Sequence, residues 1–341
     1  MTSEPRFIQG LSNPEDFALI PETDWVITSS LAGGTRPEVR PVFVNIRSQE
    51  VVEAFPNCHF ELDEATYGPI EPPENPLFHG LHVRQESDGS ATVYQVNHQG
   101  GADAEKGRES IEVFSVTVVN DRPRLAWVGA VELPDWGWGN DVCALPTGGF
   151  AVANFAFGGA KNFAPDQRRA FEAVADWVVS GRPTGNVIEW TDQETGWLIA
   201  PGTDLNTPNG IEVSADGRYF YVGLWAAEVV ARIERMAGDT PERRTIETGL
   251  LTDNLTWSDD GKILATGQRT TAHQVLEDFL EEGVDHGYPY HVLEIDPELS
   301  GSTQLVNDDS AGMLATTAAE IGGDIWVGTS RGDGIAVYEV E

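Results

Sequence analysis

The stretch "TPNGIEVSADGRYFYV" (207–222) has the pattern of two short β-strands joined by a turn. Apolar residues line both flanks of Asp216-Gly217, a pair that is typical of tight hairpin turns. Since this pair already supplies the turn, the Asn209-Gly210 pair in front of the first strand needs another explanation. The same plan recurs along the chain, and the recurrence decides the fold.

The recurring unit has a polar or small two-residue head, an apolar strand, a turn rich in Gly, Asp or Pro, and a second apolar strand. Copies lie at 15–30, 79–98, 140–155, 209–225, 253–267 and 316–330. Further strand candidates, which would complete four-stranded blades on the outside, lie at 111–119, 186–192, 229–235, 291–296 and 335–340. Six hairpins in series predict an all-β chain that folds as one six-bladed β-propeller over residues 1–341.

Two segments depart from the β pattern and have helical spacing, "APDQRRAFEAVADWVVSG" (164–181) and "HQVLEDFLEEGVD" (273–285). We predict that they belong to short helical or loop insertions at 158–181 and 270–287 on one face of the propeller. The first is a candidate lid. For the second, a role over the face and simple padding of a blade edge both remain open.

Composition narrows the class of partner. Lys and Arg number 21 against 55 Asp and Glu, a formal charge of -34 whose field repels phosphate backbones and anionic lipid surfaces. We therefore expect no nucleic acid or membrane partner, and either a solvated acidic surface or bound cations. No segment approaches the roughly 18 consecutive apolar residues of a membrane span, and the first residues lack a secretory pattern, so a cytoplasmic location is expected. Cys58 and Cys143 are too few for a disulfide framework and are expected to be small buried side chains.

The heads of the six hairpins are expected to meet. In a propeller the innermost strand of each blade begins at the central channel, so Asn209 is placed for the axis and not for a turn. The six heads are Glu15-Asp16, His79-Gly80, Asn140-Asp141, Asn209-Gly210, Asp253-Asn254 and Thr316-Thr317. Any one of them alone is an ordinary turn former, but six in matched positions predict a ring of oxygen ligands.

Such a ring suits a hard divalent cation such as calcium, which takes about 6–8 oxygen ligands. One set of residues offers two carboxylates, which match the charge of one ion, and three amides: Glu15, Asn140, Asn209, Asp253 and Asn254. Asp16 and Asp141 follow in the strands, one step deeper, and are candidates to hold another ion with a backbone carbonyl near Leu81.

Two histidines begin and end one hairpin. His79 and His98 either form a proton relay that activates water near the metal or are hydrogen-bonded core residues. The other histidines, which have no comparable placement and are expected to be structural, are His59, His82, His273, His286 and His291. Four aromatic residues just beyond strand ends or heads either line an apolar acyl pocket or pack within the blades: Phe78, Phe155, Phe157 and Trp225.

Several segments together resemble the paraoxonase/arylesterase family, within the wider group of calcium-dependent six-bladed lactonases that includes the SMP-30/gluconolactonase proteins. These segments are "EDFALIP" (15–21), "FHGLHV" (78–83), "YQVNH" (94–98), "GNDVCALPTGGFAVAN" (139–154), "PNGIEVSADGRYFYV" (208–222) and "DNLTWSDDG" (253–261). The resemblance implies two calcium ions in a central tunnel. It places the catalytic ion on Glu15, Asn140, Asn209, Asp253 and Asn254, the structural ion on Asp16, Asp141 and the Leu81 carbonyl, and a histidine dyad on His79 and His98.

The chain also departs from that family. It begins almost at the first blade, without the hydrophobic helix that animal paraoxonases use for lipoprotein attachment, so binding to lipid particles is not expected. Cys58 lies near one expected disulfide position, but the final strand candidate "IAVYEV" (335–340) has no cysteine. Closure of the ring should therefore rest on hydrogen bonding and packing between the two chain ends.

The sequence thus favours a calcium-dependent hydrolase whose substrates are small lactones or aryl esters. Phosphotriesters are candidate promiscuous substrates. The protein is expected to be a monomer or a homodimer. His79 relayed by His98 is one candidate base, and Glu15 or Asp253 on the ion is the other. Asn140 and Asn209 are candidate donors to the developing oxyanion. The alternatives are a sugar lactonase of the gluconolactonase type, which would prefer a polar pocket, a propeller of the strictosidine-synthase type, and a non-catalytic binding scaffold.

Overall fold

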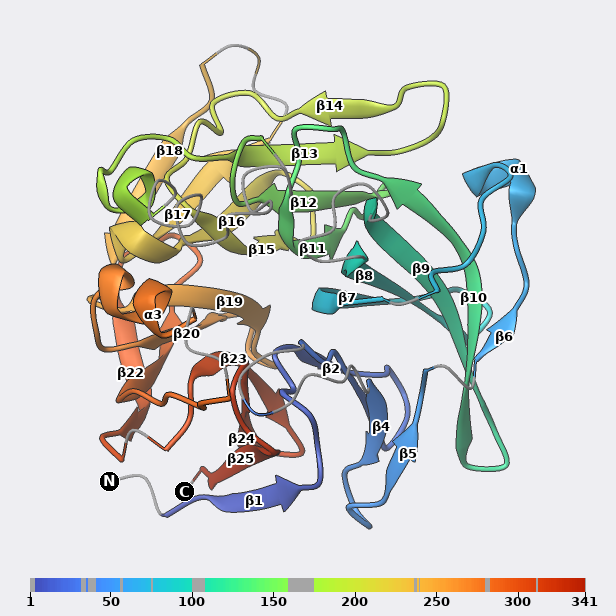
Figure 1. The fold of residues 1–341 in the computed structure, drawn as a ribbon, viewed down its shortest axis with the longest axis horizontal. Helices are drawn as coiled ribbons and strands as arrows, with labels where there is room; N and C mark the ends of the chain where they lie inside the picture. The colour runs from blue at the N-terminus through green and yellow to red at the C-terminus, as the bar shows by residue number, and fades with distance from the viewer. Residues whose placement is uncertain are drawn as a thin grey trace.

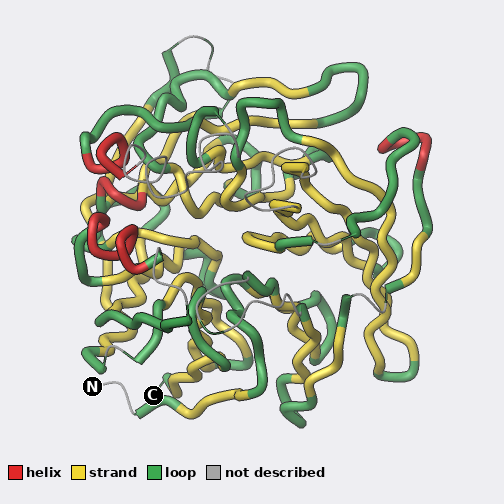
Figure 2. The backbone as a smooth tube through the Cα atoms, in the orientation of Figure 1, coloured by secondary structure: helices red, strands yellow, loops and turns green. Residues whose placement is uncertain are grey.

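The computed structural model describes residues 4–31, 35, 41–55, 58–74, 76–99, 108–158, 175–235, 238, 240–279, 283–310 and 312–340. Figure 1 shows these residues arranged as six twisted antiparallel sheets around a central axis. Strands account for most of the regular structure, and the helices are few and short (Figure 2). The predicted six-bladed β-propeller is confirmed.

The four strands from the innermost outward follow chain order in five blades, and four of the six blades contain no strand from elsewhere in the chain. The first three blades contain β2 (Phe17–Leu19), β3 (Trp25–Thr28), β4 (Val42–Asn45) and β5 (Val51–Glu53); β7 (Phe78–Gln85), β8 (Ala91–Gln99), β9 (Arg108–Val119) and β10 (Arg122–Glu132); and β11 (Gly139–Ala144), β12 (Phe150–Asn154), β13 (Asn186–Trp190) and β14 (Trp197–Ile199). A short strand, β6 (His59–Phe60), pairs in parallel with β10 and gives the second blade a fifth strand.

The other three blades contain β15 (Pro208–Val213), β16 (Tyr219–Leu224), β17 (Val229–Glu234) and β18 (Arg243–Glu247); β19 (Leu251–Trp257), β20 (Ile263–Gln268), β21 (Tyr290–Ile295) and β22 (Ser302–Asp308); and β23 (Ala315–Ile321), β24 (Asp324–Thr329), β25 (Gly334–Glu339) and β1 (Arg6–Gln9). The strand candidates expected on the outside of the hairpins are the third strands β9, β13, β17, β21 and β25. Helical elements among the described residues include α1 (Glu64–Tyr67), η2 (Trp225–Ala227) and α3 (Ala272–Asp278).

The two ends of the chain close the ring. The N-terminal strand β1 pairs antiparallel with β25, with Ile8 opposite Ile335, and becomes the outer strand of the last blade. Backbone bonds from Leu11 to Asp333 and from Asn13 to Gly332, each 2.9 Å long, continue this pairing. Both cysteines are free thiols. Closure therefore rests on hydrogen bonds between the ends, as expected, although β1 itself was not predicted.

The heads of the inner strands lie at irregularities of the sheet. In five blades the pairing of the innermost strand with its neighbour shifts register at the head, between Phe78 and Leu81, Gly139 and Asp141, Pro208 and Ile211, Thr252 and Leu255, and Ala315 and Ala318. A bulge takes residues out of the regular ladder and re-aims their side chains. This is why two consecutive residues of one strand can both serve the same end of the tunnel.

Two head glycines are required by the close approach of neighbouring blades. A Cβ atom on Gly80 would lie 2.5 Å from the Asp141 Oδ1 atom, and one on Gly210 would lie 2.5 Å from the Asn254 Cα atom. Both distances are too short for a real side chain, so larger residues would push the heads of adjacent blades apart. Both residues of the Asn209-Gly210 pair therefore have a role at the tunnel: Asn209 is the candidate ligand, and Gly210 allows the neighbouring blade to approach closely.

Helical segments cover the tunnel end where the inner strands begin. Thr271 caps the N-terminus of helix α3, because its side chain accepts a hydrogen bond from the Gln274 backbone N–H, and the helix buries Val275 and Leu276. These side chains share one apolar cluster with Val178, which belongs to a short helical stretch at 175–179, and with Leu314 directly before β23. Of the predicted insertion at 158–181, residues 159–174 lie outside the described residues. None of the helices in the described ranges has the length and apolar character that a membrane crossing requires.

Candidate metal and catalytic site

Asp16 and Asp141 bind the backbones of the next blades. The Asp16 Oδ2 atom accepts a hydrogen bond from the Leu81 N–H at 2.8 Å, and the Asp141 Oδ2 atom accepts one from the Ile211 N–H at 2.8 Å. The other carboxylate oxygens accept from the N–H groups of their own strands, 2.9 Å from Phe17 in the case of Asp16. The two deeper carboxylates therefore tie the inner strands of adjacent blades together.

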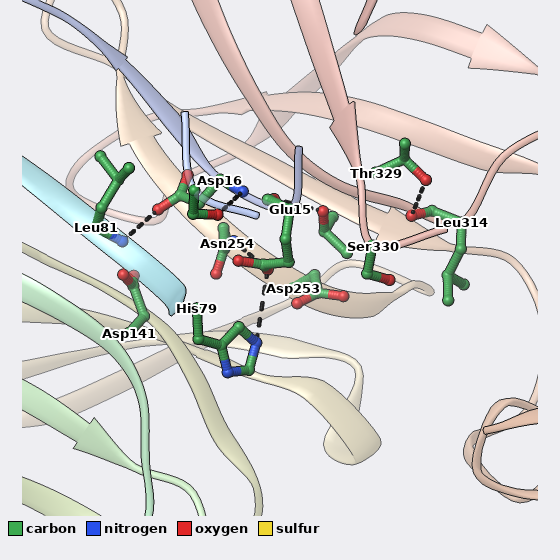
Figure 3. Close-up of polar contacts among 12 residues, drawn as sticks. Glu15, Asp16, His79, Leu81, Asp141, Asp253, Asn254, Leu314, Thr329 and Ser330 are labelled. Atoms are coloured by element: carbon green, nitrogen blue, oxygen red, sulfur yellow. Dashed lines mark hydrogen bonds and ion pairs between the residues drawn. The ribbon is translucent and has the colours of Figure 1, made fainter. Parts of the chain in front are cut away.

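The shallower head residues form a connected cluster, shown in Figure 3. The Asn254 Nδ2 atom donates to the Glu15 Oε1 atom at 2.8 Å, which joins the fifth blade to the first. The Gln268 Nε2 atom donates to the Asp253 Oδ2 atom at 2.8 Å and holds that carboxylate in place. The Thr316 hydroxyl donates to the Glu15 backbone carbonyl at 2.6 Å. These bonds join the heads of the fifth and sixth blades to the head of the first.

Four of the five residues predicted to hold the catalytic ion leave a buried oxygen without a hydrogen-bond partner among the described residues. These atoms are Glu15 Oε2, Asn140 Oδ1, Asn209 Oδ1 and Asn254 Oδ1. Buried polar atoms are nearly always satisfied, because burying one without a partner costs free energy. The amide of Asn254 is oriented by its bond to Glu15, so its oxygen is the atom left over. Four buried oxygens without donors, all on the predicted strand heads, are suitable ligands for a cation.

The buried carboxylates of the cluster also need a positive charge nearby if they are to be ionised. Burial raises the pKa of Glu15 well above its ordinary value, and the charges of Asp16, Asp253 and Asp141 raise it further. Burial raises the pKa of Asp253 to about 7, against hydrogen bonds from Gln268 and Asn209 that lower it. A bound cation would stabilise the ionised forms of these carboxylates.

The donor set restricts which cation fits. Within the described ranges, no group of three or more His, Cys, Asp or Glu side chains is arranged to hold a metal ion. Any cation at the heads must therefore draw part of its shell from the asparagine oxygens. A mixed shell of carboxylate and amide oxygens suits a hard ion such as calcium and not a zinc ion, which prefers nitrogen and sulfur.

His79 and His98 are brought into contact, as the relay hypothesis requires. The His79 Nδ1 atom lies 3.0 Å from the His98 Nε2 atom, and the His79 Nε2 atom lies 3.8 Å from the Glu15 Oε1 atom. Burial lowers the pKa of His79 well below its ordinary value, and the neighbouring His98 and Arg331 lower it further. His79 is therefore a neutral imidazole at neutral pH, with one ring nitrogen turned toward the carboxylate cluster (Figure 3).

The contact extends to a residue that the sequence did not single out. His98 lies opposite Glu109 on β9, and its Nδ1 atom is 2.6 Å from the Glu109 Oε2 atom. The Trp138 Nε1 atom is also near the same nitrogen, at 3.1 Å. We assign the Nδ1 proton to the bond with Glu109, because a short bond to a carboxylate is the stronger of the two. Glu109, His98 and His79 then form a chain that ends at Glu15.

The four predicted pocket aromatics separate into different places. Phe78 is buried in the core between the first two blades, with ring centroids 5.5 Å from Phe55 and 6.0 Å from Phe114. Its neighbour in sequence, His79, turns to the tunnel, as expected when successive side chains of a strand alternate. Phe78 is thus placed as a packing residue.

Two of the other three aromatics lie beneath the helices that cover the tunnel end. Phe155 and Trp225 belong to the apolar cluster beneath α3. The Trp225 Nε1 atom donates to the Gln268 Oε1 atom at 3.2 Å, and Gln268 in turn holds Asp253. Phe157 is half-buried, with its ring 6.4 Å from that of Trp177. Trp225 is therefore linked to the site through Gln268, which it contacts.

The remaining histidines are dispersed. His82 lies 3.8 Å from Glu212, and burial lowers its pKa to about 4. His291 contacts Asn307 at 2.7 Å on an outer strand pair. His59 lies on β6, and His273 on α3 is mostly exposed. Their distribution agrees with structural roles.

No protein-family model matches the chain, and no curated protein matches it significantly. Solved structures share its fold. A candidate gluconolactonase is 14% identical with a TM-score of 0.55, over 98% of this chain and 91% of that one. A luciferin-regenerating enzyme is 11% identical with a TM-score of 0.54, over 98% and 94% of the two chains. The PQQ-bound aldose sugar dehydrogenase of Streptomyces coelicolor is 11% identical with a TM-score of 0.58, over 100% and 98%.

At these identities the likeness is one of fold alone. The names of the three proteins span a lactonase, a luciferin-regenerating enzyme and a sugar dehydrogenase, so the architecture does not select one reaction. The chain is a six-bladed propeller whose tunnel end gathers carboxylates, amide oxygens and a histidine pair. Its function has to be inferred from these groups.

Proposed function

We propose that the protein is a calcium-dependent hydrolase of lactones or aryl esters that acts at the tunnel end. The observation that supports this most strongly is the set of four unpartnered buried oxygens, on Glu15, Asn140, Asn209 and Asn254, beside a neutral buried histidine. A non-catalytic scaffold would have no use for either feature. The sequence motifs favour the paraoxonase type within this class.

The chain offers ligands for two ions. The catalytic ion would be held by Glu15, Asn140, Asn209, Asp253 and Asn254, and a deeper structural ion by Asp16, Asp141 and the Leu81 carbonyl. When bound at the shallower position, calcium would act as a Lewis acid on the carbonyl oxygen of the substrate.

The histidine pair supplies a base. If Glu109 accepts the Nδ1 proton of His98, the His98 Nε2 atom is left with a lone pair that accepts the Nδ1 proton of His79. The His79 Nε2 atom then carries a lone pair on the side of Glu15 and can take a proton from water. Glu15 and Asp253 remain the alternative base, because both carboxylates have raised pKa values in the absence of the ion.

A sugar lactonase is the second candidate function. Polar groups reach the tunnel end beside the aromatic ones, since Gln268 contacts Asp253 and the buried Ser330 hydroxyl has no partner among the described residues. A polar pocket favours a hydroxylated substrate. The candidate gluconolactonase among the structural neighbours has the same fold, which is compatible with both candidates.

A hydrolysis panel tests the function and separates the two candidates. Aliphatic lactones, aryl esters, sugar lactones and phosphotriesters would be assayed with calcium, after chelation, and after calcium is added back. We expect turnover of lactones or aryl esters that disappears on chelation and returns with calcium. Turnover confined to sugar lactones would favour the alternative. Absence of hydrolysis of every substrate by calcium-loaded protein would contradict the proposal.

Calcium should also stabilise the fold in a pH-dependent way. Without the ion, burial raises the pKa of Asp16 to about 6 and that of Asp253 to about 7, above the value near 4 in unfolded chains. Between about pH 4 and pH 7 the folded ion-free protein binds more protons than the unfolded chain, so its stability falls as the pH rises through this window.

At low pH calcium must displace protons from these carboxylates, which weakens its binding. At higher pH the carboxylates are already ionised, so calcium binds more tightly. Added calcium should therefore raise the Tm of chelated protein by roughly 5–10 °C at about pH 7.5 and by less at about pH 5.5. Scanning fluorimetry of the same preparation at both pH values measures this. Equal shifts at the two pH values, or none at either, would contradict the assignment of the carboxylates to a calcium site.

A further inference from the structure

A buried arginine stands at the tunnel end and has no role in the proposed chemistry. Arg331 follows β24, whose last residue Thr329 pairs with Ala315 at the start of β23. The next residue of β23, Thr316, is bonded to Glu15. Figure 3 places Ser330, the neighbour of Arg331, on the side of Glu15 and Asp253. Arg331 therefore belongs to the same end of the tunnel as the candidate site.

No carboxylate of the described residues lies within ion-pair distance of the Arg331 guanidinium group. The residue is only 8% exposed, its Nη1 atom donates to the Ser330 carbonyl at 2.7 Å, and its Cζ atom lies 4.3 Å from the centre of the Phe279 ring. Among the described residues, the Ser330 carbonyl and the Phe279 ring are the contacts of this side chain, and neither carries a negative charge. Asp285 acts on it through its charge, but the oxygens of that carboxylate accept hydrogen bonds from Thr35.

Two other buried arginine side chains of the same chain form ion pairs. Arg232 lies 2.6 Å from Glu298, and Arg235 lies 2.6 Å from Glu189. Buried charges are usually paired in this way, because an unpaired one is costly. Burial lowers the pKa of Arg331 to about 10, so the group still carries its charge at neutral pH. A buried, positively charged guanidinium of this kind is suited to binding an anionic ligand.

The backbone around Arg331 is fixed. Its N–H donates to the Thr329 hydroxyl at 3.1 Å, and that hydroxyl donates to the Arg331 carbonyl at 2.7 Å. The Gly332 N–H donates to the Asn13 side chain at 3.0 Å. The aromatic ring of Phe279 supports one side of the guanidinium plane. A charged group held in place before binding loses little freedom when a ligand is bound.

We propose that Arg331 binds a carboxylate of the substrate, so that the preferred substrate is a lactone or ester carrying a carboxylate away from the reacting carbonyl. The planar guanidinium matches the two oxygens of a carboxylate, and a single guanidinium balances one negative charge. Arg331 follows Ser330, which Figure 3 shows beside Glu15 and Asp253, so an anion bound to the guanidinium would lie at the end of the tunnel that holds the relay. This inference rests on the proposed function and names the substrate class for it.

The test compares lactones that share a ring and differ only in the end of the side chain. A γ-lactone series with one to four methylenes before a carboxylate would be assayed beside the matching carboxamides and phosphates, with wild-type protein and with Arg331→Met, Arg331→Lys and Arg218→Met. Arg218 is a control, because it lies in an exposed ion pair with Glu234. Binding of carboxylate-bearing lactams, which are not hydrolysed, would be measured by calorimetry.

For wild-type protein we expect the best carboxylate to exceed its carboxamide by about 10- to 100-fold in kcat/KM, mostly through KM. This ratio should fall to near one in Arg331→Met, stay partly in Arg331→Lys, and be unchanged in Arg218→Met. A ratio near one in wild-type protein, or higher turnover of the phosphates, would overturn the inference. So would a loss in Arg331→Met that is equal for charged and neutral substrates, because the arginine would then only balance the carboxylate cluster.

The calorimetry separates the two levels of the proposal. If carboxylate lactams bind wild-type protein and not Arg331→Met while no lactone is hydrolysed, the anion site stands and the hydrolase function fails. If lactones are hydrolysed but the carboxylate lactams bind no better than their carboxamides, the function stands and the anion site is refuted.

Discussion

The Asp253→Ala variant is expected to lose roughly 10³-fold or more of its hydrolytic activity and to remain a folded propeller. Asp253 would supply one of the two carboxylates of the catalytic ion. Its loss should leave the fold intact, because Gln268 keeps its second hydrogen bond, to the Ala315 carbonyl, and because a buried carboxylate that repels its neighbours is removed. Activity under saturating calcium, together with the Tm, measures both parts of this expectation.

Asp260→Ala is the matched control, since Asp260 is exposed in the turn of the same hairpin. It should keep wild-type activity. Asn209→Ala should behave like Asp253→Ala, because it removes one of the four unpartnered oxygens. Near-wild-type turnover in Asp253→Ala or Asn209→Ala would contradict the ligand assignment, whereas unfolding of both variants would show that these heads hold the blades together.

The His79→Gln variant should lose about 10²–10⁴-fold in rate while its calcium content stays normal. The base must be neutral to accept a proton, and the pKa of His79 is lowered by burial and by the neighbouring His98 and Arg331. The acidic limb of the pH–rate profile should therefore lie below pH 6.5 in wild-type protein and vanish in the variant. A small loss with the limb retained would assign the base to a carboxylate on the ion.

The relay makes a further distinction possible. His98→Gln and Glu109→Ala should each approach the rate of His79→Gln and add little to it in double variants, because members of one chain fail together. Glu109→Gln should keep part of the activity, since its amide oxygen can still accept the Nδ1 proton of His98. Independent losses that multiply would mean that the histidines and Glu109 shape the site without passing a proton.

The repeat pattern of the sequence was sufficient to predict the architecture and the convergence of the heads. Each head precedes an apolar strand and a recognisable turn, so the equivalence of Asn209 and His79 could be seen without knowing any contact. β1 was missed because it is a four-residue strand with three exposed positions, and its partner β25 lies at the other end of the chain. No local signal marks a strand of that kind.

The supporting residues could not be found in the same way. Glu109 reaches His98 only through the register of β8 with β9, and Gln268 reaches Asp253 from the end of β20. Arg331 depends on the conformation of the turn after β24. These relations are set by strand register and loop geometry, which composition and spacing do not encode. Phe78 shows the reverse case, where a residue beside a head faces the core.

Metal analysis of the purified protein tests the central claim most directly. Mass spectrometry of protein prepared without added metal, and again after dialysis against calcium, should find about two calcium ions per chain in the wild type and about one in Asp253→Ala. Asp260→Ala should match the wild type. Wild-type protein that contains no calcium and takes up none, or that holds as much after Asp253→Ala, would contradict the assignment of the strand heads to a calcium site.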